Sequence, residues 1–353
     1  MNSTPTLPLA ETIWKRFRKE VAIHNYSEIL ALHALARMGT HGDPRFLEPA
    51  RTELAAFLDG RVPQVHGAFR LYRVGGNASA WLLLNGKLEG RDGVLAQACR
   101  DLVAEHPRTR LGLFTFPNRP ETLWIDAAFA VCPFLAMVGV ALKNDAWVDE
   151  AIRQILLLRG ILLDGNTGLF RQAVGFSGPG VRSHDLWSRG NGWAAIALCE
   201  LACVVPTTHP MGPTLRALFI DHVEACRRTQ DGDGLWHQQM DDRASYVETS
   251  GSGLILYAMG RGLETKLLGA ETRAAFEKGL GGYLKYLSPE GAVDQTCTGC
   301  LSPKDGSVEA YKDNAWRLND EHAFGPAMLA FSQAHLLGIK AVPGAPTGRD
   351  SAS

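Results

Sequence analysis

The segment 185–193 carries the densest group of residues whose types suit chemistry. Trp187 and Trp193 lie on either side of Arg189, immediately before a strongly apolar run. An indole face stacks on the apolar face of a sugar ring, and a guanidinium binds a carboxylate through two parallel hydrogen bonds. These residue types therefore predict a site for a carbohydrate or a carboxylate. A tryptophan-rich turn of the core, in which Asn191 caps the next helix, explains the same residues equally well.

A second segment, 116–136, places one carboxyl group among large apolar residues. Asp126 follows Trp124 and Ile125 and precedes a run of Ala, Phe and Val. Apolar surroundings disfavour the charged form, so a carboxylic acid in this position stays protonated near neutral pH and can donate a proton. An aspartate in the first turn of a helix, favoured by the helix dipole, is the structural alternative. We favour the functional interpretation because Asp126 lies on the apolar side, one turn into the expected helix.

Two later segments add polar groups just before helices. Segment 234–252 contains Trp236 and His237 and ends in hydroxyl and carboxyl groups that are typical of a helix cap. His322, in segment 317–326, stands near the start of the last expected helix. A lone histidine in such a position is more often structural than catalytic, so neither segment predicts a function by itself.

The elements that must position these groups are helices. Apolar residues recur at steps of three and four along nearly the whole chain, and no segment alternates with the period of a strand. The pattern predicts an all-α protein. The twelve expected helices span 10–21, 27–37, 47–58, 78–84, 94–104, 121–143, 146–163, 189–205, 213–228, 248–264, 271–287 and 320–337.

Turn-forming connectors recur along the chain and indicate how the helices are arranged. They lie at 164–168, 231–234 and 288–291, at intervals of ~60 residues. Six helical hairpins of this kind close into an (α/α)6 barrel with an inner and an outer ring. An open α-solenoid is the competing architecture, but the repeats share no short consensus. Because no Pro- or Ser-rich linker divides the chain, we expect one catalytic domain over 1–342 and a disordered tail over 343–353.

Composition excludes several classes of function. The 353 residues include 36 Lys and Arg and 37 Asp and Glu, a balance that argues against a nucleic-acid or other polyanion binder. Charged residues interrupt every apolar stretch before the ~20 residues of a membrane span, and the first residues do not resemble a signal peptide. Five of seven cysteines lie in apolar helical segments, which favours a reducing cytoplasm. No metal-ligand spacing or phosphate-binding glycine loop is present, so we expect no metal and no cofactor.

Four motifs, in their order along the chain, resemble the unsaturated uronyl hydrolases of glycoside hydrolase family 105 and the related unsaturated glucuronyl hydrolases. The similarity covers roughly residues 72–337. Any one motif is weak, whereas four in order are specific. The resemblance implies the (α/α)6 barrel. The motifs are Trp124–Ala136, Trp187–Trp193, Gly234–Ser252 and Asn319–Gly325.

The resemblance implies hydration of a vinyl ether. Polysaccharide lyases leave a uronic acid with a C4=C5 double bond at the non-reducing end of a short oligosaccharide. Asp126 matches the family's catalytic aspartate, which donates a proton to C4 and then helps water add at C5, after which the hemiketal opens and releases the saturated sugar. Arg189 would hold the uronate carboxylate, and Trp187 and Trp193 would form stacking walls. The other matched side chains expected at the substrate are Trp124, Trp236, His237 and His322.

Two positions depart from the family pattern. Many members carry a second aspartate on an earlier loop, whereas segment 73–79 has none, and a family histidine is replaced by Gln172. Either the pocket recognises a different sugar, with Asn77, Gln172 or His184 as substitutes, or proton transfer is impaired. We favour altered specificity, because Asp126 is retained.

Two alternatives stay open at this point. One is a glycosidase for saturated uronates, with a second carboxylate from Asp185, Glu248 or Asp320. The other is an inactive carbohydrate-binding barrel. In the leading interpretation the partner is a small oligosaccharide with a terminal uronate, and we expect no nucleic-acid or membrane partner. We expect the protein to be a monomer or a weak homo-oligomer.

Overall fold

The computed structural model describes residues 2–21, 26–62, 71–116, 118–299 and 307–350. Within these ranges it contains thirteen α-helices, six strands of two or three residues and two 3-10 helices, at Pro44–Phe46 and Leu284–Tyr286. The helices are α1 (Thr6–Glu20), α2 (Tyr26–His41), α3 (Leu47–Leu58), α4 (Gly76–Leu84), α5 (Asp92–Glu105), α6 (Asp126–Leu142), α7 (Asp145–Leu162), α8 (Ser188–Val204), α9 (Gly212–Thr229), α10 (Thr249–Glu264), α11 (Ala270–Tyr283), α12 (Val308–Lys312) and α13 (Phe324–Leu336). The strands are β1 (Ser3–Pro5), β2 (Leu123–Trp124), β3 (Ala173–Val174), β4 (Thr296–Cys297), β5 (Trp316–Arg317) and β6 (Ala341–Pro343).

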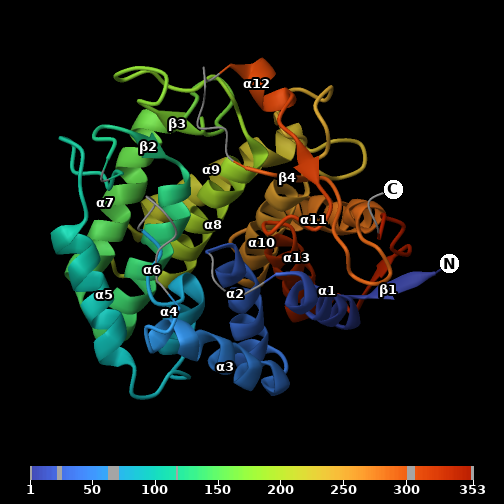
Figure 1. Ribbon diagram of the computed structural model, residues 1–353, viewed down its shortest axis with the longest axis horizontal. Coiled ribbons are helices and arrows are strands. Elements are labelled where there is room, and N and C mark those ends of the chain that lie inside the picture. Colours follow the sequence, from blue (N-terminus) through green and yellow to red (C-terminus); the bar gives the residue numbers. More distant parts are fainter. Residues whose placement is uncertain (1, 22–25, 63–70, 117, 300–306, 351–353) are drawn as a thin grey trace.

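Six helices form a closed inner ring. Helices α2, α4, α6, α8, α10 and α13 pack against one another in that order, and α13 returns to α2. Outer helices cover this ring: α1 packs on α13, α3 on α2, α5 and α7 on α6, α9 on α8, and α11 on α10 (Figure 1). The predicted (α/α)6 barrel is therefore confirmed. Helix α12 is an additional short helix that the apolar periodicity did not predict.

Burial follows from the composition of the two rings. In α6 every residue from Asp126 to Gly139 is buried, and α8 and α10 are buried over most of their length. The outer helix α7 buries one stripe, which includes Trp147, Ile155 and Leu158. A helix that is apolar all round has no face for water and takes the inner position, whereas an amphipathic helix covers it from outside. No helix of the described residues is long and apolar enough to span a membrane.

The start of α6 differs from the expected one, and the difference concerns Asp126. The helix begins at Asp126 and not at residue 121, because Glu121 has a positive φ of 63° and residues 123–124 form β2. Strand β2 pairs antiparallel with β3, so that Leu123 is opposite Val174. Asp126 is thus the first residue of the helix rather than one turn inside it. It is buried nonetheless, because inner-ring helices surround this end of α6.

The segment that was expected to be disordered is packed against the barrel over residues 343–350. Strand β6 pairs antiparallel with β1. Beyond it, the Thr347 N–H donates to the Leu284 carbonyl at 3.0 Å, and Arg349 forms an ion pair with Asp294 at 2.7 Å. These bonds to β1, Leu284 and Asp294 outweigh the Pro- and Gly-rich composition. Residues 351–353 lie outside the described ranges.

The inner ring encloses a buried group of charges at the C-terminal ends of its helices. Glu200 of α8 is fully buried and accepts a hydrogen bond from the Tyr257 hydroxyl of α10. His33 of α2 lies 3.6 Å from the same carboxylate, and Arg261 lies 3.9 Å from it. Burial by itself raises the pKa of Glu200, but His33, Arg261 and Arg37 outweigh burial and hold the pKa at about 2. The group therefore holds a charged carboxylate inside the barrel.

We expect Glu200→Ala to lower the free energy of unfolding by about 3–5 kcal/mol, because the change leaves the Arg261 and Arg37 charges buried without this carboxylate.

The wild type should also lose stability in acid. The folded pKa of about 2 lies below the ordinary 4.5, so this contribution is complete above pH 4.5 and is lost as pH falls toward 2. Urea unfolding at pH 7 and pH 3 measures both effects. Glu264→Ala, which removes a carboxylate with a 25% exposed side chain, is the control and should cost less. A loss below 1 kcal/mol for Glu200→Ala would contradict the prediction.

Candidate active site

Asp126 is a buried carboxyl at the N-terminus of an inner helix. It is 7% exposed, and its Oδ2 has no hydrogen-bond partner among the described residues. Burial raises its pKa to about 6, while the positive charge of Arg189 and the indole N–H of Trp193 act in the opposite direction. A carboxyl with this pKa is partly protonated near neutral pH, so it can donate a proton and afterwards accept one.

Arg189, the second residue of α8, is held by neutral oxygen atoms. Its Nη1 donates to the Ser250 hydroxyl at 3.1 Å and to the Cys297 carbonyl at 2.8 Å. The guanidinium carbon lies 4.6 Å from the centre of the Trp187 ring. Such acceptors and an aromatic face fix the orientation of a guanidinium. Arg189 is 1% exposed, so its charge acts in a poorly solvated environment.

His322 is fixed by a carboxylate just before α13. Its Nδ1 lies 2.8 Å from Asp320 Oδ1, and Arg317 donates to Asp320 Oδ2 at 2.6 Å. Burial by itself raises the pKa of Asp320, but its hydrogen bonds with His322 and the nearby positive charge together outweigh burial and hold the pKa at about 2. Because a carboxylate only accepts, the proton of the imidazole is on Nδ1. Burial and then the charge of Arg189 lower the pKa of His322, so the ring is neutral.

One end of the barrel collects these groups. Arg189, at the N-terminal end of α8, acts electrostatically on Asp126 at the N-terminal end of α6. It also acts on Asp320 and His322, which lie just before α13. Asn77, in the first turn of α4, donates to the Phe129 carbonyl of α6 at 3.4 Å. Helix N-termini carry partial positive charge, and here several of them face the same region as a buried arginine. The electrostatic environment at this end of the barrel favours an anionic ligand.

Trp187 and Trp193 are core residues in this structure. Both are 0% exposed; Arg189 covers the face of Trp187, and Phe129 stacks on Trp193 with ring centres 4.6 Å apart. Neither ring offers an exposed face to a sugar in this structure, and the role of the two residues as stacking walls stays a prediction. Asn191 has a structural role but is not the helix cap that the sequence suggested: it is the fourth residue of α8, and its side chain bonds the backbone of Phe170.

Trp124 belongs to a partly exposed aromatic group. Phe176 stacks on it at 4.8 Å with an interplanar angle of 5°, and Phe116 meets it edge-on at 4.4 Å. Trp124 immediately precedes Ile125 and Asp126 in the chain. Phe176 was not anticipated from the sequence, because it lies in a Gly- and Ser-rich loop without periodicity and reaches Trp124 only through the β2–β3 pairing.

Gln172 and Asn77 lie at the same end of the barrel as Asp126. The Gln172 carbonyl accepts from the Ile125 N–H at 2.9 Å, which ties the loop before α8 to the start of α6. Asn77 is 2% exposed, and its Oδ1 has no hydrogen-bond partner in the described part of the chain. Their role as substitutes for the family's missing polar groups stays a prediction.

Three other predicted site residues lie apart from this group. His184 is exposed, and its carbonyl accepts from Arg171. Trp236 is fully buried and donates its indole N–H to the Cys226 carbonyl at 2.7 Å, which makes it a core residue. His237 bonds Asp231 at 3.2 Å within its own turn. The side chains of Trp236 and His237 therefore stabilise the loop before α10.

The carboxylates that a two-carboxylate glycosidase needs have structural partners. Glu248 caps α10 through the N–H groups of Ser250 and Gly251. Asp320 is bonded to His322 and Arg317. Asp185 accepts from the Trp187 N–H at 3.3 Å; burial raises its pKa to about 6, against the Ser183 hydroxyl, and the nearby cation is Arg171 rather than Arg189. Asp126 is thus the carboxyl best placed to react beside Arg189.

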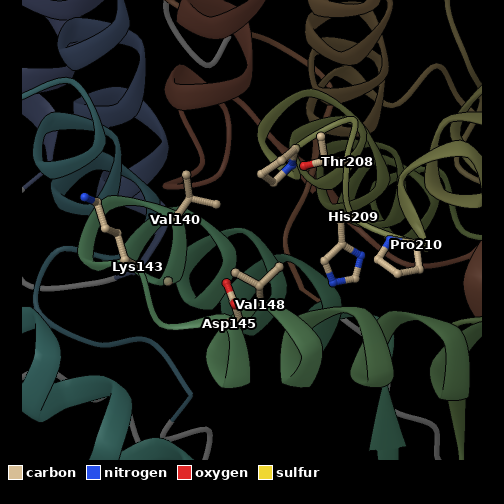
Figure 2. Close-up of a pocket in the computed structure, with 9 residues that line it drawn as sticks. Val140, Lys143, Asp145, Val148, Thr208, His209 and Pro210 are labelled. Atoms are coloured by element: carbon tan, nitrogen blue, oxygen red, sulfur yellow. The ribbon is translucent and has the colours of Figure 1, made fainter.

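A separate pocket lies at the opposite end of the barrel. Figure 2 shows four of the residues that line it, Val140, Val148, Thr208 and His209. Its volume is about 400 Å³. These residues are at the C-terminal end of α6, in α7 and in the connection from α8 to α9. Since Val140 follows Asp126 by 14 residues in α6, this pocket is ~21 Å along the helix from Asp126. It is no part of the Asp126 site.

The comparisons with known proteins agree with this fold. Residues 82–337 match the model of Glycosyl Hydrolase Family 88. The chain belongs to this family, and it is a glycoside hydrolase. Its likeness to solved structures agrees with the resemblance to family 105 drawn from the motifs. A family 105 glycoside hydrolase of C. acetobutylicum superposes with a TM-score of 0.79 at 20% identity, covering 92% of this chain and 99% of that one. An unsaturated glucuronyl hydrolase of Bacillus sp. GL1 gives 0.66 at 13% identity, with 98% of both chains covered.

Curated relatives share sequence over part of their length. Unsaturated rhamnogalacturonyl hydrolase YesR of Bacillus subtilis is 29% identical over 195 residues, which is 55% of this chain and 54% of that protein. An unsaturated 3S-rhamnoglycuronyl hydrolase of Formosa agariphila is 28% identical over 156 residues, 41% of each. The match to YesR thus spans about half of that protein's length.

Proposed function

We propose that this enzyme removes a 4,5-unsaturated uronic acid from the non-reducing end of short oligosaccharides by hydrating its C4=C5 double bond. The observation that carries the proposal is the buried Asp126 carboxyl, with a pKa of about 6, beside the oriented cation Arg189. A vinyl ether needs a proton donor at carbon, and a uronate needs a cation. YesR and the Formosa agariphila enzyme are both named as hydrolases of unsaturated sugars, which supports the same substrate class.

The proposed reaction uses one carboxyl group twice. Asp126 transfers its proton to C4, and the electron pair of the C4=C5 bond forms the new C–H bond, which leaves a cation at C5 stabilised by the ring oxygen. Water then adds to C5 and returns a proton to the Asp126 carboxylate. The resulting hemiketal opens and releases the remaining sugar, so no second carboxylate is needed. The structural roles of Glu248 and Asp320 support this single-acid scheme.

The uronate would be recognised at the end of the barrel that holds Arg189 and the helix N-termini. Arg189 binds the carboxylate on C5, and the neutral His322 and the Asn77 amide offer hydrogen bonds to hydroxyl groups. Trp124 and Phe176 offer a partly exposed aromatic face beside Asp126.

We further propose that the protein is one catalytic domain and that it works in a reducing cytoplasm. The six unpaired cysteines of the described chain support this location.

The test is turnover of lyase digests of pectin, ulvan and glycosaminoglycans, followed by loss of the ultraviolet absorbance of the conjugated double bond. We expect turnover of at least one digest, with kcat/KM falling as pH rises through about 6. The sign follows from the reaction, because Asp126 must be protonated to react and its pKa is raised to about 6. Cleavage of a chromogenic saturated glucuronide without any loss of absorbance would replace the proposal by the saturated-uronate glycosidase, and tight binding without turnover of either would replace it by the carbohydrate-binding barrel.

A further inference from the structure

Glu248 is a buried carboxylate at the junction of α8, α10 and β4. It is 0% exposed and acts as the N-cap of α10. Its Oε1 accepts from the Ser250 N–H at 3.0 Å, from the Ser250 hydroxyl at 2.6 Å and from the Cys297 N–H at 3.2 Å. Its Oε2 accepts from the Gly251 N–H at 2.7 Å and from the Ser188 hydroxyl at 3.0 Å. An ordinary N-cap bonds only its own helix, so the bonds to Ser188 and Cys297 serve a further purpose.

The groups that Glu248 binds outside its backbone cap are those that hold Arg189. The two acceptors of Arg189 Nη1 are the Ser250 hydroxyl and the Cys297 carbonyl, and both residues are anchored on Glu248 Oε1. Ser188, which precedes Arg189 in the chain, is anchored on Oε2. Arg189 is therefore attached to one carboxylate by three independent routes.

The polarity of these bonds is set by the carboxylate. A serine hydroxyl has a single proton, and Ser250 donates it to Glu248, so its lone pairs are left to accept from Arg189. Glu248 also draws the starts of α8 and α10 together. At residue 251 an added Cβ would collide with the Ser188 hydroxyl and backbone, so glycine is needed for this approach.

We propose that Glu248 is the positioning residue for Arg189, which it orients toward the substrate carboxylate through Ser250, Cys297 and Ser188 without contacting substrate. This inference rests on the proposed function, in which Arg189 binds the uronate. A guanidinium whose Nη1 is fixed keeps a single orientation, whereas one without this anchor loses affinity by sampling several. Disturbing the anchor therefore weakens substrate binding more than it slows the chemical step.

Two serine variants of the same helix test the proposal. Ser250→Ala removes one acceptor of Arg189 and keeps the backbone cap. We expect a rise in KM of about tenfold with kcat within about threefold. Ser252→Ala is the matched control, because it also removes a buried hydroxyl, which bonds Trp236 and the Glu248 carbonyl and makes no contact with Arg189. We expect its KM to stay within about twofold of wild type.

Substitution of the carboxylate itself gives a graded series. Glu248→Gln keeps an oxygen for Ser250 and Cys297 but places an amide N–H₂ against the Gly251 N–H, so we expect a smaller rise in KM than for Glu248→Ala. Urea unfolding of each variant separates loss of binding from loss of folding. Equal KM changes in the Ser250 and Ser252 variants, or no change in either, would overturn the positioning role.

A readout without turnover keeps this proposal separate from the proposed function. Arginine-selective ¹⁵N NMR reports rotation about the Cζ–Nε bond of Arg189. We expect slow rotation in the wild type and in Ser252→Ala, and fast rotation in Ser250→Ala and Glu248→Ala. A wild type that turns over no unsaturated uronate refutes the proposed function, while the NMR comparison still decides whether Glu248 orients Arg189. Fast rotation in the wild type would overturn the inference.

Discussion

Asp126→Asn should lower kcat on a lyase-generated unsaturated disaccharide by about 10³-fold and leave KM within about threefold. Asparagine keeps the shape of the side chain, but it cannot give a proton to C4 or take one from water. KM changes little because the carboxylate of the substrate is bound by Arg189 rather than by Asp126. Loss of absorbance under initial-rate conditions measures both constants.

The matched control for this variant is Asp185→Asn. Asp185 is also a fully buried carboxyl whose pKa burial raises to about 6, but the cation near it is Arg171. The two changes therefore have similar costs for folding and differ in distance from the reacting bond. We expect Asp185→Asn to keep kcat within about tenfold. Unchanged turnover in Asp126→Asn, or an equal loss in both variants, would rule out proton donation by Asp126.

The second large effect is expected for Arg189→Gln, with a fall in kcat/KM of about 10²-fold to 10³-fold, mainly through KM. The variant loses the cation for the uronate carboxylate in a site with little water. Arg189→Lys keeps the charge without the planar guanidinium, so its kcat/KM should lie between those of Arg189→Gln and the wild type. Initial rates over a range of substrate concentrations separate KM from kcat.

The methyl ester of the unsaturated uronate is the matched substrate for this experiment. The wild type should prefer the free acid strongly, and Arg189→Gln should lose that preference, because the ester has no charge to bind. The pH profile of kcat/KM provides a second test of this assignment. Arg189 lowers the pKa of Asp126, so its removal should move the alkaline limb of kcat/KM to higher pH. A variant that still prefers the free acid as the wild type does would contradict this assignment.

Much of the architecture could be predicted from local patterns. The three- and four-residue apolar period is a property of single helices, so it identified the helices of both rings without knowledge of their neighbours. The connectors at intervals of ~60 residues indicated hairpins, and hairpins of apolar and amphipathic helices bury their faces by closing into a barrel. Asp126 was singled out because its neighbours in the chain are apolar, which indicates a buried segment, although the inner-ring helices supply the burial itself.

Contacts between distant segments decided the rest. The β2–β3 pairing moved the start of α6 to Asp126 and brought Phe176 to Trp124. Trp187 and Trp193 have the residue types of a sugar site, but the inner ring covers their faces, and burial depends on the whole barrel rather than on residue type.

The sequence by itself determined which side chains are available for chemistry: an aspartate in an apolar segment, an arginine between tryptophans and a capping glutamate. Only the tertiary structure decided that Arg189 is held by Ser250 and Cys297, which are 61 and 108 residues away, and that Glu248 anchors both. The physical reason is that the direction of a guanidinium depends on its hydrogen-bond acceptors, and closure of the barrel brings those acceptors from separate hairpins to one end of the inner ring.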